Sequence, residues 1–390
     1  MNFVRKLWQR GCDLLPITGF YVDRPLVVLQ SDDWGRVGVR DQEGFEQLRS
    51  AGIALGDHPY DFHSLETAED LTALGTVLKK HSDSSGRRPC IGMNFVVANI
   101  DFAKMRADAN ARLQLLTLAN GLPEGWKRPN LLEAYRVGIS DGVFRAAVHG
   151  TTHFCRDAVE RNWLAGGERA SLMRTLWECG TPYIYWRMPW VGYEYWDPEQ
   201  SENEQFLSLE SQQDLIGQAV AEFAKVFSCL PHSACAPGYR ANTDTRRAWA
   251  QHGIKVAQNG PDGFVPPHFD SNEILQLTRT VELEPAVDPA FTVEACVRKA
   301  ERCFARGVPA IVSVHSINFH STLRDFRSRT LAAIDEFLGA LEAKHDDLLY
   351  VQDEDLYELV SKGSYKAGAR DLKVHVTRKN FWRNAERKDA

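Results

Sequence analysis

Short runs of apolar residues alternate along this chain with longer segments in which apolar residues recur every three or four positions. The first run, Pro25 to Gln30, is apolar almost throughout, which is typical of a strand buried on both faces of a parallel sheet. Similar runs predict strands at 89–98, 142–148, 233–236, 253–258, 273–277, 309–314 and 348–351. Helical spacing predicts helices at 43–51, 68–80, 208–228, 292–305 and 321–343, one that contains Trp249 and is capped by Thr243 or Asp244, and one that ends near 360.

This alternation of strands and helices predicts a parallel α/β fold. If the sheet closes into a barrel, the carboxyl ends of its strands surround one pocket. The polar residues that directly follow each strand are therefore the first candidates for function.

The segment Ser31-Asp32-Asp33-Trp34-Gly35 follows the first predicted strand. Two adjacent carboxylates at the carboxyl end of a parallel strand lie where α/β folds usually place their chemistry. Taken alone, the pair is equally well explained as a turn that caps the next helix. It needs partners from later in the chain.

A second candidate, His149-Gly150-Thr151-Thr152-His153, follows the strand predicted at 142–148. Histidines four residues apart on one helical turn project the same way and suit two imidazoles on one metal ion. Gly150 stands where an H-E-x-x-H protease has its catalytic glutamate, so that class is not indicated. A lone pair of histidines is often incidental, and Asp33 is the candidate for a third ligand.

Aromatic residues are concentrated at 177–196, which holds eight of them in twenty positions. No helical or strand period organises them, and interspersed proline and glycine predict a shaped loop. One interpretation is a hydrophobic cluster under a long insertion. The other is a platform for sugar rings, whose apolar faces stack on aromatic side chains.

Composition excludes several classes of protein. The chain has 390 residues, 44% of them hydrophobic, which is ample for a folded core. Its net charge of -6 argues against nucleic acid as a partner. No apolar run approaches the roughly 18 residues of a membrane span, and no signal-peptide core is evident. The eight cysteines include no C-x-x-C pair, so neither a zinc ribbon nor a disulfide scaffold is predicted. We expect a cytoplasmic protein.

The two ends of the chain differ from the rest. Residues 3–15 have the spacing of an amphipathic helix, and residues 362–390 hold nine Lys or Arg against three Asp or Glu. Together they predict peripheral association with an anionic membrane surface. The alternative is a helix that packs against the main domain and a solvated tail.

Four segments, Ser31–Gly35, His149–His153, Ala236–Arg240 and Ser313–His315, resemble in order the motifs of the polysaccharide deacetylase superfamily (NodB-homology, carbohydrate esterase family 4). The match extends over roughly 25–360. The resemblance implies an incomplete, distorted (β/α) barrel and a divalent metal ion, Zn²⁺ or alternatively Co²⁺, Ni²⁺ or Mn²⁺. It also implies hydrolysis of N-acetyl or O-acetyl groups on a sugar, in assembly of a cell-surface polysaccharide or lipid-linked glycan.

Carried over residue by residue, the resemblance implies three metal ligands, Asp33, His149 and His153. It makes Asp32 the general base and His315 the acid that protonates the leaving amine. Tyr239 would offer its backbone N–H to the oxyanion. These roles are chemically consistent, because hydrolysis of an amide needs an activated water, a base and a proton for the leaving group.

The sequence departs from the family pattern in three respects. Cys235 stands where many members have an arginine that orients the catalytic aspartate, and Arg240 is the candidate to replace it. His149 lies 116 positions after Asp33, a spacing that exceeds the one in compact members. The aromatic segment at 177–196 has no general counterpart.

Two other functions remain open. One is a barrel amidohydrolase that acts on a small non-sugar amide, and the other is a glycan-binding relative without turnover. The intact set of Asp32, Asp33, His149, His153 and His315 argues against the latter, because a binding module has no need for a base and an acid beside a metal. We expect three parts in the chain: a lead-in at 1–22, a barrel at 23–361 with insertions that include 160–205, and a basic tail at 362–390.

Overall fold

The computed structural model describes residues 21–108, 111–367 and 372–375. No helix within these ranges has both the length and the apolar content needed to cross a membrane. The segment 3–15 and the tail beyond His375 lie outside the described residues, so association with a membrane surface stays a prediction.

A ten-stranded sheet forms the centre of the molecule, in the order β10-β11-β1-β2-β5-β6-β7-β9-β8, with β12 also paired to β1. Every pairing in it is parallel except that of β8 with β9. The strands of this sheet are β1 (Leu26–Trp34), β2 (Ile91–Phe95), β5 (Phe144–Val148), β6 (Ser233–Cys235), β7 (Val256–Asn259), β8 (His268–Phe269), β9 (Leu275–Thr278), β10 (Val281–Glu282), β11 (Ala310–His315) and β12 (Leu349–Tyr350). Two small antiparallel sheets pair β3 (Ala98–Ile100) with β4 (Leu115–Thr117) and β13 (Ser364–Ala367) with β14 (Leu372–His375). The predicted parallel α/β fold is confirmed.

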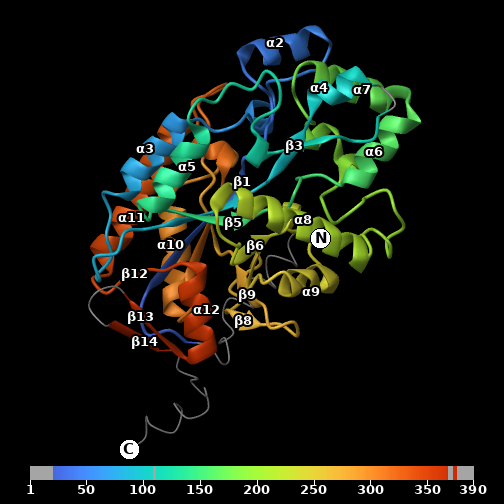
Figure 1. The fold of residues 1–390 in the computed structure, drawn as a ribbon. Coiled ribbons are helices and arrows are strands. Elements are labelled where there is room, and N and C mark those ends of the chain that lie inside the picture. Colours follow the sequence, from blue (N-terminus) through green and yellow to red (C-terminus); the bar gives the residue numbers. More distant parts are fainter. Residues whose placement is uncertain (1–20, 109–110, 368–371, 376–390) are drawn as a thin grey trace, which may run out of the picture.

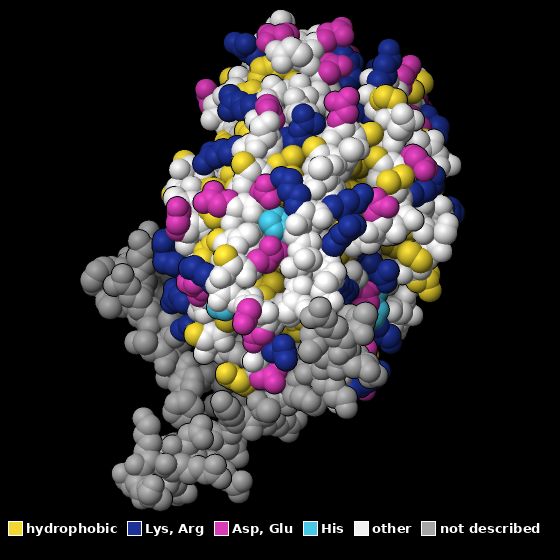
Figure 2. Space-filling view, turned by 90° about the vertical axis from the view of Figure 1, so that its left-hand side faces the viewer, with side chains coloured by type: hydrophobic (Ala, Val, Ile, Leu, Met, Phe, Trp, Pro, Cys, Tyr) yellow, Lys and Arg dark blue, Asp and Glu magenta, His cyan; other side chains and the backbone are white. Residues whose placement is uncertain are grey.

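Helices cover the outside of the sheet (Figure 1). They are α2 (Gln42–Ser50), α3 (Ala68–Leu78), α4 (Phe102–Ala107), α5 (Leu131–Ser140), α6 (Arg156–Ala165), α7 (Gly167–Glu178), α8 (Leu209–Phe227), α9 (Thr243–Gln251), α10 (Val293–Ala305), α11 (Arg327–Lys344) and α12 (Asp353–Lys362). Figure 1 shows α3, α5 and α11 side by side on one flank, and α4, α6 and α7 gathered at the opposite upper side. On the first flank, basic and acidic side chains intermingle (Figure 2), and Lys80 and Asp335 link the end of α3 to α11 at 2.7 Å.

Side chains from distant strands meet inside the sheet. Asn94 on β2 donates to Gln258 on β7 at 2.6 Å, although β5 and β6 lie between these strands. Arg279, which follows β9, donates to Gln30 on β1 at 3.1 Å. These contacts require the sheet to curl around a polar interior, whereas β10 and β8 are not paired with each other in the described residues. The sheet is thus an incomplete, distorted barrel, as expected.

Several boundaries differ from the prediction; α11, for example, begins at Arg327 and not at residue 321. The strand expected at 89–98 is divided into β2 and β3, because the chain leaves the large sheet after Phe95 and its next strand pairs with β4 instead. The residue that caps α9 is Asn242, whose side chain accepts from the backbone N–H of Thr245 at 2.9 Å, and not Thr243 or Asp244.

The parallel strands bring the predicted residues to one edge of the sheet. Asp32 at the end of β1 is the register partner of His315 at the end of β11. His149 directly follows β5, and Tyr239 ends the short 3₁₀ turn Pro237–Tyr239 after β6. A shared edge is therefore what the order of strands imposes on these residues.

Candidate metal and catalytic site

Asp33, His149 and His153 converge at this edge. Oδ1 of Asp33 lies 3.0 Å from Nε2 of His153 and 3.5 Å from Nε2 of His149. One potential ligand atom from each residue lies within 4.8 Å of the other two. Even His153, the most accessible of the three, is only 9% exposed. The structure thus brings together the three residues expected as metal ligands.

The hydrogen bonds of this group leave lone pairs facing one another. Nδ1 of His149 lies 2.8 Å from the backbone carbonyl of Cys235, which can only accept, so in the neutral ring Nε2 carries a lone pair. Oδ1 of Asp33 is buried and has no hydrogen-bond partner. Burial and the charge of Arg36 lower the pKa of His153 to about 4, so that this ring is neutral at pH 7, and its Nδ1 lies 3.0 Å from the Tyr183 hydroxyl. An anionic oxygen beside imidazole lone pairs fits a cation, and two nitrogens with one carboxylate suit Zn²⁺ or a similar divalent ion.

A second group of potential ligands, Asp32, His149 and Cys235, lies close by. Burial and the neighbouring Asp32 raise the pKa of the Cys235 thiol well above its ordinary value, whereas a metal would need the thiolate. Asp32 is also fully engaged by an arginine, as described below. The group around Asp33 therefore fits a metal better.

A loop, and not the helical turn we predicted, brings the two histidines together. The segment 149–153 lies between β5 and α6. Gly150 has a φ of +86°, and a Cβ at this position would overlap the carboxylate of Glu194. That carboxylate accepts from the backbone N–H groups of Thr151 at 2.7 Å and Thr152 at 3.0 Å. Glycine and Glu194 together thus fix the loop that carries both imidazoles.

Arg36 holds the third ligand. Its Nη1 donates to Oδ2 of Asp33 at 2.8 Å, which leaves Oδ1 directed at the histidines. Burial alone would raise the pKa of Asp33, but the charge of Arg36 outweighs it and holds that pKa well below its usual value. The carboxylate of Asp33 is therefore ionised at neutral pH.

Asp32 lies in a different environment, bound by Arg279. The Nη2 atom of Arg279 donates to Oδ1 of Asp32 at 2.6 Å, and Nη1 donates to Oδ2. Asn94 also donates to Oδ1, at 2.8 Å. Although burial opposes ionisation, Arg279 lowers the pKa of Asp32, so that this residue is a fixed anion. It can accept a proton but has little freedom to move.

The arginine that orients Asp32 is therefore Arg279, and the prediction of Arg240 for this role is wrong. Arg240 is exposed, and its guanidinium lies 4.7 Å from the centre of the Trp196 ring. The reason is local: Arg240 ends the turn after β6 and points out of the barrel interior, whereas Arg279 follows β9 and points across that interior.

Tyr239 contributes its side chain and not its backbone. Its N–H already donates to the carbonyl of Ala236 at 2.8 Å, which contradicts the predicted role of that N–H as an oxyanion donor. Its phenol oxygen accepts from Nη1 of Arg279 at 2.9 Å and lies 3.5 Å from Nε2 of His315. Because the oxygen accepts from Arg279, the phenol proton is free to donate into the cavity.

His315 is paired with a carboxylate that the sequence analysis did not identify. Nδ1 of His315 lies 2.7 Å from Glu284, and Nε2 lies 3.9 Å from Oδ2 of Asp32. Burial lowers the pKa of the imidazole, but Glu284 raises it more strongly, to about 9. His315 is therefore protonated at neutral pH and carries a proton that it can give away. Asn318 donates to the other oxygen of Glu284 at 2.6 Å and fixes the pair.

These groups open into a cavity of about 330 Å³. Its polar floor is formed by Asp32, Asp33, Arg36, His149, His153, Tyr239 and His315, and its wall includes His58, Tyr60, His63, Tyr183, Tyr185, Trp186 and Tyr193. At the mouth, Trp186 is 38% exposed, stacks on His58 with ring centres 5.1 Å apart and donates to Asp61 at 3.0 Å.

The aromatic segment is thus divided between the two predicted roles. Trp177 and Tyr195 are buried in the core, as the packing interpretation expects. Tyr183, Tyr185 and Trp186 line the cavity, where the platform interpretation places them. The loop histidines His58 and His63 also line it.

Sequence reasoning missed four charged residues of the site: Arg36, Glu194, Arg279 and Glu284. A signal existed for two of them. Arg36 is three residues after Asp33, and Arg279 lies just after the strand predicted at 273–277, so the rule that selected His315 selects it as well. Glu284 comes two residues after β10, a two-residue strand that the apolar pattern does not predict. Glu194 had no such signal, because it lies inside the irregular aromatic segment.

No protein-family model matches the sequence, and no curated protein sequence is similar to it. Fifty-three chains of solved structures match the fold. A candidate polysaccharide deacetylase from Mycobacterium smegmatis is 11% identical, with 90% of this chain and 95% of that chain covered and a TM-score of 0.47. The Xyl-CE4 domain of a multidomain xylanase from the hindgut metagenome of Trinervitermes trinervoides is 9% identical, with coverage of 90% and 100% and a TM-score of 0.38.

A pseudoenzyme of the CE4 family from Bacillus anthracis is 11% identical, with 88% of this chain and 69% of that chain covered and a TM-score of 0.38. The family named for these structures is the one that the motifs resemble. Because all three TM-scores are below 0.5, the geometry of the site, and not these structures, carries the functional argument.

We expect Asp33→Ala and His153→Ala to lose bound divalent metal, because each removes one of three protein ligands. Asp32→Asn should retain it, since Asp32 contacts Arg279 and not the ligand group. Metal content after dialysis, measured by mass spectrometry on the purified proteins, checks this. Equal metal content in all three variants would contradict the ligand assignment.

We expect Arg279→Gln to lower the free energy of unfolding by about 3–5 kcal/mol, because it leaves the charge of Asp32 buried and unpaired. Arg240→Gln is the matched control and should change stability by less than about 0.5 kcal/mol, because Arg240 is exposed. Denaturant titration measures both. Similar losses in the two variants would show that Arg279 is not the partner on which Asp32 depends.

Proposed function

We propose that this protein is a metal-dependent hydrolase that removes the acetyl group from an N- or O-acetylated sugar. One observation carries the proposal: a fixed anion, Asp32, and a protonated imidazole, His315, lie 3.9 Å apart in one cavity beside a set of metal ligands. A base and an acid next to a divalent cation is the arrangement that hydrolysis of an amide requires.

Each residue has a defined part in the reaction. A divalent cation, when bound at Asp33, His149 and His153, would polarise the acyl carbonyl and lower the pKa of a water molecule. Asp32 accepts a proton from that water as the water oxygen bonds to the carbonyl carbon. When the bond from carbon to nitrogen breaks, His315 gives its proton to the departing amine, and the products are acetate and a free amino group.

The phenol of Tyr239 is the donor that supports the carbonyl oxygen. Its oxygen is fixed by Arg279, and its proton is directed away from that arginine. A preorganised donor of this kind stabilises negative charge as it develops on the substrate oxygen. It takes the place of the backbone N–H that donates to Ala236.

The walls of the cavity support a sugar as the substrate. Tyr185, Trp186 and Tyr193 offer aromatic faces, and stacking on such faces is a common way to bind the apolar face of a sugar ring. The volume of about 330 Å³ is at the lower end of the range for small-molecule sites, so a single or terminal sugar residue fits better than an internal segment of a polymer.

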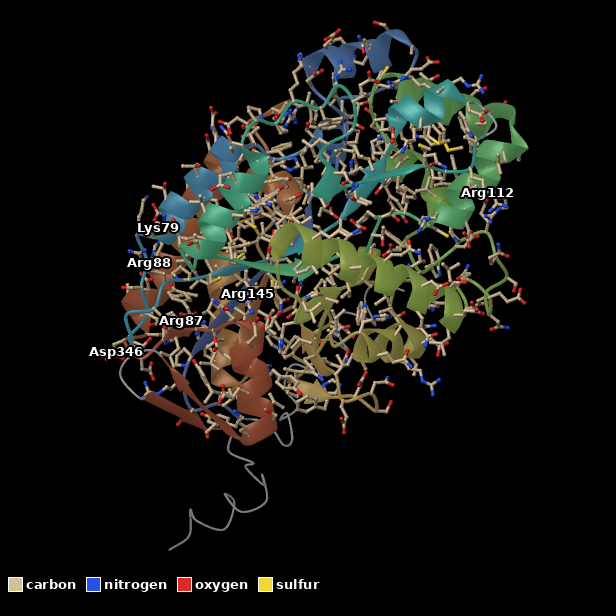
Figure 3. All side chains as sticks on the ribbon, viewed as in Figure 1. Lys79, Arg87, Arg88, Arg112, Arg145 and Asp346 are labelled. Atoms are coloured by element: carbon tan, nitrogen blue, oxygen red, sulfur yellow. The ribbon has the colours of Figure 1, made fainter. Side chains whose placement is uncertain are left out.

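The test is acetate release by the metal-loaded protein from a panel of acetylated sugars, with small non-sugar acetamides alongside. Asp32→Asn and His315→Gln should each lower kcat roughly a hundredfold or more, the usual contribution of a general base or acid. Arg145→Gln is the control: this exposed residue at the start of β5 lies beside α12, where it pairs with Glu354 (Figure 3). Acetate release only from the non-sugar amides would favour the amidohydrolase, and unchanged rates in both variants would refute the mechanism.

The pairing of His315 with Glu284 predicts a specific dependence on pH. His315 must be protonated to act as an acid, so kcat/KM should fall as pH rises through its pKa of about 9. Glu284→Gln removes the charge that raises this pKa and should move the alkaline limb of the profile about one unit or more toward neutral pH.

The same pair contributes to stability, with a sign that follows from the raised pKa. Its contribution is complete below the pKa of a histidine in the unfolded chain and is lost as pH rises toward about 9. The melting temperature of Glu284→Gln should therefore depend less on pH in this interval than that of the wild type. For catalysis, an alkaline limb of the kcat/KM profile at the same pH in the wild type and in Glu284→Gln would show that His315 is not the group that sets this limb.

A further inference from the structure

Two buried arginines flank the adjacent aspartates and differ in how their donors are used. Arg279 has an acceptor for each of its three side-chain nitrogens. Arg36 is 8% exposed; its Nη1 donates to Asp33 at 2.8 Å, and its guanidinium also interacts with Tyr183, whose ring centre lies 5.2 Å away. Its Nε is buried without a partner. Unused donors on a buried guanidinium cost free energy, and Arg36 lines the cavity, where a ligand can supply the missing acceptor.

The charged side chains around the cavity balance one another in pairs, except at Arg36. Asp32 is balanced by Arg279, and Glu284 is balanced by protonated His315. With a divalent cation held at Asp33, two positive charges remain, one from the cation and one from Arg36. The developing negative charge on the carbonyl oxygen compensates one of them. The second positive charge can be compensated by a negatively charged group on the substrate.

His63 adds a second polar group with no partner. It is 3% exposed, both of its ring nitrogens lack hydrogen bonds, and it lines the same cavity. Both side chains line the same cavity, and burial together with the charge of Arg36 lowers the pKa of His63 well below the usual value, so the imidazole is neutral. A guanidinium beside a neutral N–H donor is a favourable arrangement for a carboxylate or a phosphate.

We propose that Arg36 and His63 form an anion-binding subsite, and that the substrate is an acetylated sugar that carries a carboxylate or phosphate close to the acetylated position. This inference rests on the proposed function and names the class of its substrate. Arg36 then has two tasks: one N–H holds the metal ligand Asp33, and the remaining donors bind the substrate.

The test compares kcat/KM for acetate release from N-acetylglucosamine, N-acetylmuramic acid and N-acetylglucosamine 1-phosphate, because the last two carry a substituent with a carboxylate or a phosphate on a carbon next to the acetylated C2. The wild type should favour at least one charged sugar by about tenfold or more, as expected for a charge-assisted hydrogen bond. The two charged sugars distinguish a carboxylate site from a phosphate site. Arg36→Gln should bring the preference close to one, Arg36→Lys should retain part of it, and Arg145→Gln should leave it unchanged.

The preference, and not the rate alone, is the informative quantity, because a loosened metal site would lower the rates for charged and neutral sugars together. Binding of the same sugars to metal-loaded Asp32→Asn, measured by calorimetry, gives a readout without turnover. If Arg36→Gln does not fold or hold metal, the proposal is decided by two other results: the preference of the wild type for charged sugars, and the binding of the same sugars to Asp32→Asn.

The two proposals fail in different ways. Release of acetate with equal kcat/KM for neutral and charged sugars overturns the subsite and leaves the hydrolase in place. If no sugar releases acetate, the proposed function fails. The subsite is then tested by whether the protein binds the charged sugars more tightly than the neutral one. An undiminished preference in folded, metal-loaded Arg36→Gln overturns the role of Arg36.

Discussion

The buried ion pair between Asp32 and Arg279 is the interaction on which the rest of the site depends. Arg279 is completely buried, and a buried guanidinium is tolerated only when its donors are satisfied. Its donors reach Asp32 and Gln30 on β1, Gln258 on β7 and Ser313 on β11. One side chain therefore links three separate strands across the interior, and the curl of the sheet and the ionisation of Asp32 have a common origin.

Around this pair, each chemical group is held by a partner of opposite character. Glu194 holds the loop of the two histidines, Glu284 keeps His315 protonated, and Arg36 leaves one oxygen of Asp33 free. Low dielectric strengthens such pairs, and it also makes an unpaired member costly. The two adjacent aspartates can both remain ionised because each has its own arginine. Two consecutive residues thus lie in different environments, as their proposed roles of base (Asp32) and metal ligand (Asp33) require.

Much of this arrangement was predictable, because the carboxyl ends of parallel strands share an edge. Asp32, His149 and His315 follow apolar runs, so their proximity follows from topology alone. The errors arose where distance along the chain was taken for distance in space. Arg240 is the candidate that the resemblance offers within the third motif, whereas Arg279, which binds Asp32, follows a later strand. The spacing of His149 and His153 predicts a helical turn. The loop is instead shaped by Gly150, which has a positive φ, and by the carboxylate of Glu194, which lies 45 and 41 positions after the two histidines.

The backbone shows that the scaffold, and not local preference, sets the geometry of the site. Asp33 and Tyr239 are non-glycine residues with φ of +72° and +59°, values that an L-residue adopts at a cost of about 1–3 kcal/mol. Both flank the cavity, and each side chain is anchored by a buried arginine, Arg36 in one case and Arg279 in the other. Strain of this kind persists when the surrounding contacts outweigh it. The same two arginines thus keep Asp32 and Asp33 ionised. They also hold the strained backbone at Asp33 and Tyr239, whose carboxylate and phenol line the same cavity.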